Sequence, residues 1–358
     1  MRGGRRPTRS ATALVLGAAC LAAIAPAARA DELRTLDGWP SVAAALSGDN
    51  LVYLRSAAAP AKGYTVYRTE AWRLPIQPAL SLFTGVRETP ITIRTSAGRT
   101  TAGMLSGGAG GAFTLAATGK GFAPPVIWCC DPKGDEVVLE SDSRPDAPQT
   151  IAVGTDGAAT RFLVGDAEAG FELTSVNVVG PTPTQAADYV TTKFAFPGKP
   201  VRGLAAIGTG LVAWADRPGP PQVSVGAPGP TGLSGVQALA QPGRVLGVWA
   251  GGTTFVALAK APDGLELARY DLPSLQRTVI WTFRKPPPAV AVGGGAVTFV
   301  DGRNVIFTAP GRAPKGLMRA KGPVVALATD GQRVAVFDRR VVNRRQKTAI
   351  SLLPVPAA

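Results

Sequence analysis

The sequence contains no histidine among its 358 residues. Without an imidazole side chain, the protein cannot hold a Ser-His-Asp or Cys-His catalytic set, a histidine-ligated zinc ion or a histidine general base. The sequence also lacks a Gly-x-Ser-x-Gly nucleophile motif, a complete phosphate-binding loop and an Asn-x-Ser/Thr glycosylation acceptor. We therefore predict no cofactor, no metal site and no catalytic residue. Carboxylate chemistry is the enzymatic alternative that these absences leave open.

Cysteine is nearly absent as well, with Cys20, Cys129 and Cys130 as the three examples. Cys129 and Cys130 are adjacent in the segment 126–131. Neighbouring residues of a strand point to opposite faces, so a disulfide between them would need a strongly distorted peptide. The sequence predicts two buried thiols in an inner strand. A strained disulfide and a bond to a partner are the alternatives.

Residues 1–30 have the composition of a secretory signal peptide. Four arginines lie between residues 2 and 9, an apolar segment occupies residues 11–25, and residues 28–30 form an Ala-Arg-Ala cleavage site. The apolar segment is short for a membrane span. We predict a Sec signal peptide cut after Ala30, with an extracytoplasmic (secreted or periplasmic) mature chain that has no transmembrane segment. A twin-arginine signal and a lipid-modified Cys20 are alternatives.

Acidic residues are few at the C-terminal end, where most of the net charge of +14 is found. The predicted signal peptide carries five basic residues and no acid, and residues 301–358 carry eleven basic residues against three acidic ones. Residues 31–300 are therefore nearly neutral. This distribution does not favour nucleic acid as a partner, because the basic residues do not extend over the chain.

The sequence is rich in short apolar runs separated by turns that contain Gly or Pro. Between residues 244 and 283, four runs follow one another at 244–250, 253–259, 265–270 and 277–283. Two apolar inner strands followed by two amphipathic outer strands make one blade of a β-propeller. In the fourth run, Val279, Trp281 and Phe283 are expected on one face of the strand.

Similar runs begin near residues 149, 201, 244, 289 and 323, a spacing of about forty residues that is typical of propeller blades. An earlier run begins at Pro40. The segment 62–143 is expected to supply one more blade and the outer strands of the first, with a hairpin between 90–94 and 100–105 and an inner strand at 112–116. The predicted fold class is all-β, a single propeller over residues 31–358. Seven blades fit best, and six or eight are alternatives.

The last blade shows three strands in the sequence. We predict that residues 33–36 add the fourth, because a strand from the other end of the chain removes a free sheet edge.

The segment 323–337, with Asp330-Gly331 as the turn between two apolar strands, resembles the repeat of TolB-type, WD-like propellers of bacterial envelopes. The Thr155-Asp156-Gly157 turn is similar. The Gly-His and Trp-Asp pairs of eukaryotic WD repeats are missing, so their structural triad does not transfer. The resemblance implies an exported scaffold that binds a protein or a cell-envelope partner.

Carboxylates offer the remaining catalytic chemistry. Six acidic residues are close together in the sequence: Asp131, Asp135, Glu136, Glu140, Asp142 and Asp146. Paired acids serve glycoside cleavage or calcium binding, but this spacing matches no ligand loop, so a solvated outer strand and loop is the simpler interpretation. The six tryptophans stand at different positions of their repeats, and we expect them between blades rather than in a sugar-binding ring.

Five basic residues form the candidate contact site, and they lie between the predicted second and third strands of the last blade: Arg339, Arg340, Arg344, Arg345 and Lys347. With only Asp338 beside them, they predict a compact cationic hairpin tip that contacts an anionic surface. A solvated loop that keeps the protein soluble is the alternative. The predicted function is an exported, non-enzymatic scaffold. A carboxylate-dependent carbohydrate-active enzyme and a propeller that binds a small ligand or a metal are the alternatives.

Overall fold

The computed structural model describes residues 31–38, 41–47, 50–61, 64–77, 82–83, 89–91, 100–107, 113–119, 126–130, 136–140, 149–156, 159–166, 170–178, 189–196, 201–207, 210–216, 219–229 and 231–355. Side chains are described mainly from residue 210 onward and in part of 35–76. All regular elements in these ranges are β-strands. A helix long and apolar enough to cross a membrane is therefore not found among them. The predicted signal peptide at residues 1–30, with Cys20, lies outside the described residues.

The described strands form seven antiparallel sheets. The first three in chain order contain β2 (Ser41–Ser47), β3 (Asn50–Ala61), β4 (Tyr64–Gln77), β5 (Leu82–Phe83) and β6 (Thr89–Ile91); β7 (Thr100–Gly107), β8 (Phe113–Gly119), β9 (Val126–Cys130) and β10 (Glu136–Glu140); and β11 (Gln149–Asp156), β12 (Ala159–Asp166), β13 (Gly170–Val178) and β14 (Tyr189–Phe196).

The other four contain β15 (Val201–Ile207), β16 (Leu211–Asp216), β17 (Gln222–Gly229) and β18 (Gly232–Ala240); β19 (Val245–Gly251), β20 (Thr254–Ala261), β21 (Gly264–Asp271) and β22 (Thr278–Phe283); β23 (Val290–Gly293), β24 (Ala296–Asp301), β25 (Asn304–Thr308) and β26 (Lys315–Arg319); and β27 (Val324–Thr329), β28 (Arg333–Val342), β29 (Arg345–Pro354) and the N-terminal β1 (Asp31–Asp37).

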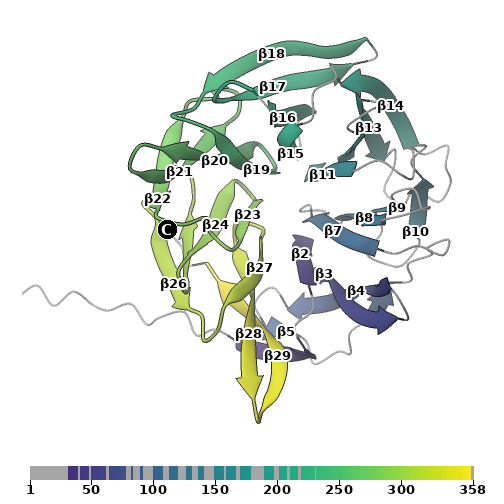
Figure 1. The fold of residues 1–358 in the computed structure, drawn as a ribbon, viewed down its shortest axis with the longest axis vertical. Helices are drawn as coiled ribbons and strands as arrows, with labels where there is room; N and C mark the ends of the chain where they lie inside the picture. The colour runs from purple at the N-terminus through teal and green to yellow at the C-terminus, as the bar shows by residue number, and fades with distance from the viewer. Residues whose placement is uncertain are drawn as a thin grey trace, which may run out of the picture.

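Each sheet lies beside the next through its first strand. These first strands are β2, β7, β11, β15, β19, β23 and β27, which follow one another around the centre of the molecule, and β27 lies beside β2 (Figure 1). Five of them begin at residues 149, 201, 245, 290 and 324. The predicted spacing of the repeats is therefore confirmed.

The strands β19 to β22 occupy the four apolar runs predicted between residues 244 and 283. The strand β20 is buried along nearly its whole length, because a neighbouring sheet covers each of its faces. Phe255 packs in a cluster with the preceding sheet, and Val256 packs in a cluster with the following sheet. Burial on both faces explains why this run is apolar at successive positions and does not alternate.

One detail of the fourth run is wrong. The register between β21 and β22 shifts next to Leu267, because β22 carries a β-bulge. Trp281 and Phe283 pack on Phe299 of the next sheet, with ring centroids 5.4 and 5.5 Å apart, which confirms the position of this tryptophan between sheets. Val279 lies on the other side of the bulge and is 44% exposed.

The segment 62–143 differs from its prediction in strand pairing. The strand β6 pairs with β4 and completes the edge of the first sheet, so it does not form the predicted hairpin with β7. The innermost strand of the next sheet is β7, and β8 is the second, so the inner strand predicted at 112–116 is confirmed. Cys129 and Cys130 lie at successive positions of β9, which is the third strand and not an inner one. Apolar alternation predicts strands here, but it does not say which neighbour each strand takes.

Glycine turns bring consecutive sheets together at the ends of their first strands. A Cβ atom on Gly251 would lie 2.2 Å from the carbonyl oxygen of Val292 in the next sheet. A Cβ atom on Gly294 would lie 1.8 Å from the carbonyl oxygen of Asp330, again in the next sheet. Because no side chain fits at these distances, the glycines permit direct backbone contact between neighbouring sheets.

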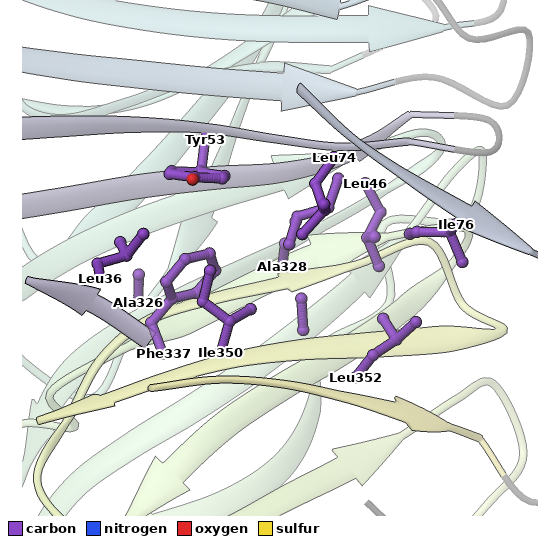
Figure 2. Close-up of a cluster of buried hydrophobic side chains, with 12 residues drawn as sticks. Leu36, Leu46, Tyr53, Leu74, Ile76, Ala326, Ala328, Phe337, Ile350 and Leu352 are labelled. Carbon is purple, nitrogen blue, oxygen red and sulfur yellow. The ribbon is translucent and has the colours of Figure 1, made fainter. Parts of the chain in front are cut away.

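The N-terminal strand completes the last sheet. β1 pairs antiparallel with β29, from Asp31 opposite Leu352 to Asp37 opposite Lys347. This confirms the predicted fourth strand. Figure 2 shows the apolar cluster between the last sheet and the first, in which Leu36 of β1 and Phe337 of β28 face Tyr53 of β3. The Tyr53 and Phe337 ring centroids are 5.8 Å apart. The two ends of the chain are thus held together by strand pairing and by a shared core.

Candidate functional site

The hairpin of β28 and β29 extends past the strands on either side of it. Its two strands pair along ten positions, from Arg333 to Val342. The neighbouring strand β27 pairs with β28 only as far as Asp338, and β1 pairs with β29 only as far as Lys347. Residues 341–346, called the hairpin tip below, consequently lie beyond the strand pairing of β27 and β1 and project from the body (Figure 1), and one backbone hydrogen bond, from the N–H of Gly38 to the carbonyl oxygen of Gln346, ties their edge to the N-terminal segment.

A tight two-residue turn forms the end of the hairpin tip. Asn343 and Arg344 connect the paired residues Val342 and Arg345, and both have positive φ angles, of 50° and 61°. Positive φ at both central positions defines a type I′ turn, whose twist matches that of the two strands. Asparagine adopts this conformation readily, and arginine does so at some cost.

A buried ion pair fixes the base of the hairpin. Asp338 is 0% exposed, and Arg340 donates two hydrogen bonds to its carboxylate, from Nε to Oδ2 at 2.8 Å and from Nη2 to Oδ1 at 2.9 Å. The backbone N–H of Gly322 donates a third at 2.9 Å. Because this charge-assisted pair is sheltered from water, it holds the strand in place more firmly than a surface pair would.

The five basic residues predicted at one tip lie in different parts of the hairpin. Arg339 and Arg340 lie within β28 and are partly buried, and Arg340 neutralises Asp338. Lys347 pairs with Asp37 of β1. Arg344 and Arg345 are exposed at the hairpin tip, where neither has an ion-pair partner among the described residues. The loop predicted between the second and third strands is wrong, because both strands continue through this segment, and an anionic contact by the five residues stays a prediction.

Two valines belong to the same hairpin tip. Val341 is 65% exposed and Val342 is 43% exposed, and they are two of the four exposed large apolar residues in the described part of the chain. The prediction from sequence omitted them, because it assigned these positions to a polar loop. The two β-branched residues directly before Asn343, a residue that favours a tight turn, are the signal that could have shown a longer hairpin.

A second polar centre joins two sheets. Arg269 of β21 donates hydrogen bonds to both carboxylate oxygens of Asp271, from Nη2 to Oδ1 and from Nε to Oδ2, each at 2.7 Å. Its Nη2 also reaches the carbonyl oxygen of Gly295 in the next sheet at 2.7 Å. Burial alone would raise the pKa of Asp271, but hydrogen bonds from Arg269 and Thr254, together with the charge of Arg269, lower it below its usual value. Through its contacts with Asp271 and with the carbonyl oxygen of Gly295, Arg269 connects two neighbouring sheets.

Three of the described carboxylates lie on different sheets, and each has its own partner. Glu266 pairs with Arg277, Asp330 pairs with Arg333, and Asp301 accepts a hydrogen bond from the Trp281 indole at 3.3 Å. In the ranges that the structure describes, no three Cys, Asp or Glu side chains gather where a metal ion could bind. Of the acidic segment 131–146, only Glu136 to Glu140 is described, as the strand β10.

No protein-family model matches the sequence, and no curated protein matches it either. The fold is similar to solved structures. PorZ of Porphyromonas gingivalis, described as an essential bacterial surface component of the type-IX secretion system, superposes with a TM-score of 0.55 at 11% identity over 92% of this chain. The chain spans 39% of the length of that protein.

Two further structures cover most of both chains. The β-propeller domain of the Trilobed protease from Pyrococcus furiosus has a TM-score of 0.54 at 9% identity, over 88% of this chain and 95% of that one. The Dos1 propeller has a TM-score of 0.53 at 8% identity, over 89% and 95%. The protein is therefore an all-β protein with a β-propeller fold. The Trilobed protease propeller is described as having an open velcro topology, whereas β1 and β29 pair in this chain.

Proposed function

We propose that this chain is an exported, non-enzymatic β-propeller that acts as a scaffold for a protein or cell-envelope partner with an anionic surface. Residues 31–358 make up a single propeller of seven blades of the TolB-like type, which follows a signal peptide at residues 1–30. Seven described sheets and the pairing of β1 with β29 support the blade count. The composition of residues 1–30 supports export.

The observation that carries the proposal is the hairpin tip. Arg344 and Arg345 are exposed on a hairpin that extends past its neighbouring strands, and Asp338 at its base holds it in place. Exposed arginines on a projecting element produce a local positive field that attracts an anionic surface. The other acidic groups near the hairpin are occupied, since Asp37 pairs with Lys347 and Asp338 with Arg340.

Export is tested by the mass of the protein recovered from the extracytoplasmic fraction. The proposal predicts an N-terminus at Asp31, which corresponds to cleavage after Ala30. A full-length N-terminus in the cytoplasmic fraction would contradict it. A lipid-modified Cys20 would give a different mass and a membrane-bound product.

The anionic contact is tested by co-sedimentation with isolated cell envelopes at low and high salt. The variant Arg344→Ser/Arg345→Ser should bind weakly, and wild-type binding should fall as the Debye length shortens from about 10 Å at 0.1 M salt to about 3 Å at 1 M. The matched control is Arg312→Ser/Arg319→Ser, which removes the same charge from two exposed arginines of another sheet. Equal binding by both variants would contradict a contact at the hairpin tip.

A further inference from the structure

We infer that the hairpin tip binds an anionic lipid bilayer, inserting Val341 and Val342 into the membrane interface while Arg344 and Arg345 bind lipid phosphates. The inference rests on the proposed anionic contact and commits it to one kind of partner. It adds the two valines, which the anionic contact alone does not explain.

Two valines of the hairpin tip are exposed to solvent. Val341 and Val342 are adjacent and exposed at the part of the hairpin that extends furthest from the body. Single exposed apolar residues are ordinary on a protein surface, but two beside the turn of a projecting hairpin place apolar area where the hairpin meets a surface end-on. Removing them from water is favourable in proportion to the apolar area that is buried.

The arrangement of the two valines favours a bilayer over a protein surface. Val341 lies opposite Gln346, and Val342 lies opposite Arg345, so the two side chains point to opposite faces of the hairpin. A protein or polymer that docks on one face would cover one valine and leave the other in water. A lipid interface surrounds a tip that enters it end-on, and it covers both valines together.

Charge completes the match. Arg344 lies in the turn that follows the two valines, Arg345 comes directly after it, and no acidic residue occurs from residue 339 to residue 354. Arginine binds phosphate oxygens with two parallel hydrogen bonds, and each basic residue near an anionic membrane strengthens binding. Apolar side chains beside arginines are typical of elements that lie in the membrane interface.

The hairpin is held at its base and extends far enough beyond it for shallow insertion into a membrane interface. The Asp338–Arg340 pair holds the base, and residues 341 and 342 extend roughly 7 Å beyond it at the usual rise of a strand. This reach corresponds to the depth of about 5–10 Å at which peripheral elements enter the boundary between headgroups and acyl chains.

The test measures binding of the mature protein to vesicles that contain phosphatidylglycerol and phosphatidylcholine, to pure phosphatidylcholine vesicles, and to soluble polyglutamate. Wild type should prefer the anionic vesicles. Val341→Ser/Val342→Ser should weaken binding to them about tenfold, and Arg344→Ser/Arg345→Ser roughly thirtyfold. The control Val236→Ser/Val279→Ser removes two exposed valines elsewhere and should bind as wild type does.

The outcomes separate insertion from the anionic contact itself. If the variant at Val341 and Val342 binds anionic vesicles as wild type does while the arginine variant loses vesicle and polyglutamate binding together, insertion is contradicted and the partner is an acidic polymer or protein. If the arginine variant binds vesicles and envelopes as wild type does, the proposed function is contradicted. Thermal unfolding of each variant verifies that the fold is intact.

Discussion

The guanidinium of Arg340 holds the fully buried carboxylate of Asp338 with two hydrogen bonds, at 2.8 and 2.9 Å. This pair separates the basic residues of the last hairpin into two groups with different roles. Arg340 supports the fold, and Arg344 and Arg345 are available to a partner.

The first prediction concerns this pair. Asp338→Asn should lower the free energy of unfolding by about 3 kcal/mol, because it leaves the partly buried Arg340 guanidinium without its counter-charge. Arg344→Gln removes a charge from the same hairpin at an exposed position and should change stability by less than about 0.5 kcal/mol. Urea unfolding of both variants measures the difference. Equal effects would show that the buried pair does not stabilise the hairpin.

The type I′ turn gives a prediction of the opposite sign. Arg344 has a φ of 61°, a conformation that glycine adopts without strain, so Arg344→Gly should raise the free energy of unfolding by about 0.5–1 kcal/mol. Gln346→Gly, in the adjacent strand, should lower it by a similar amount, about 0.5–1 kcal/mol. Chemical denaturation of the two variants compares them directly. Destabilisation by both would contradict the assigned turn.

The contribution of Asp271 should depend on pH. Its folded-state pKa is below the ordinary value, so the ionised group stabilises the fold above its unfolded pKa of about 3.9. That stability is lost as the pH falls through the folded pKa. Asp271→Asn should therefore reduce stability at pH 7 and make it less dependent on pH below about 5 than in wild type. Identical acid slopes would contradict the role of the Arg269–Asp271 group.

Pairing of the chain ends predicts an effect at Leu36. This side chain is buried between the first and last sheets, so Leu36→Ala should cost about 3 kcal/mol. Thr35→Ala, at the exposed neighbouring position, is the control and should have little effect. A variant that lacks residues 31–39 should melt below the mature protein. An unchanged melting temperature would show that β1 does not stabilise the last sheet.

Much of the fold could be predicted from the sequence, because the strands and turns of each repeat are recognisable from neighbouring residues alone. Turns such as Asp330-Gly331 and runs such as 253–259 identify strands and their spacing without reference to distant residues. The partner of each strand could not be predicted in the same way. The strand β6 pairs with β4 and not with β7. This choice depends on which sheet edge is free in the folded protein, and a local sequence pattern does not show which edge that is.

The candidate site, like the fold, could be predicted from the sequence only in part. The basic character of residues 339–347 is visible in the sequence, but its meaning depends on how far β28 and β29 extend. Arg340 becomes structural because its strand continues past the position where a loop was predicted, next to the buried Asp338. The exposure of Val341 and Val342 follows from the same extension and could not be read from hydropathy, which predicts valine to be buried.

Thiol labelling tests the state of Cys129 and Cys130, which lie at successive positions of β9. Regular strand geometry does not favour a bond between neighbours. Denatured protein from the exported fraction should react with two equivalents of a thiol reagent without prior reduction. Labelling that appears only after reduction would show a disulfide, either within the pair or to a partner.

Site-specific photo-cross-linking tests most directly the central claim that the hairpin tip is the contact site. A photo-reactive side chain at Gln346 in the hairpin tip, compared with one at the exposed Arg312 of another sheet, is irradiated in intact cells. The account predicts cross-linking to envelope material from position 346 that disappears at high salt, and little from position 312. Equal cross-linking from both positions, or cross-linking from position 312 alone, would contradict it.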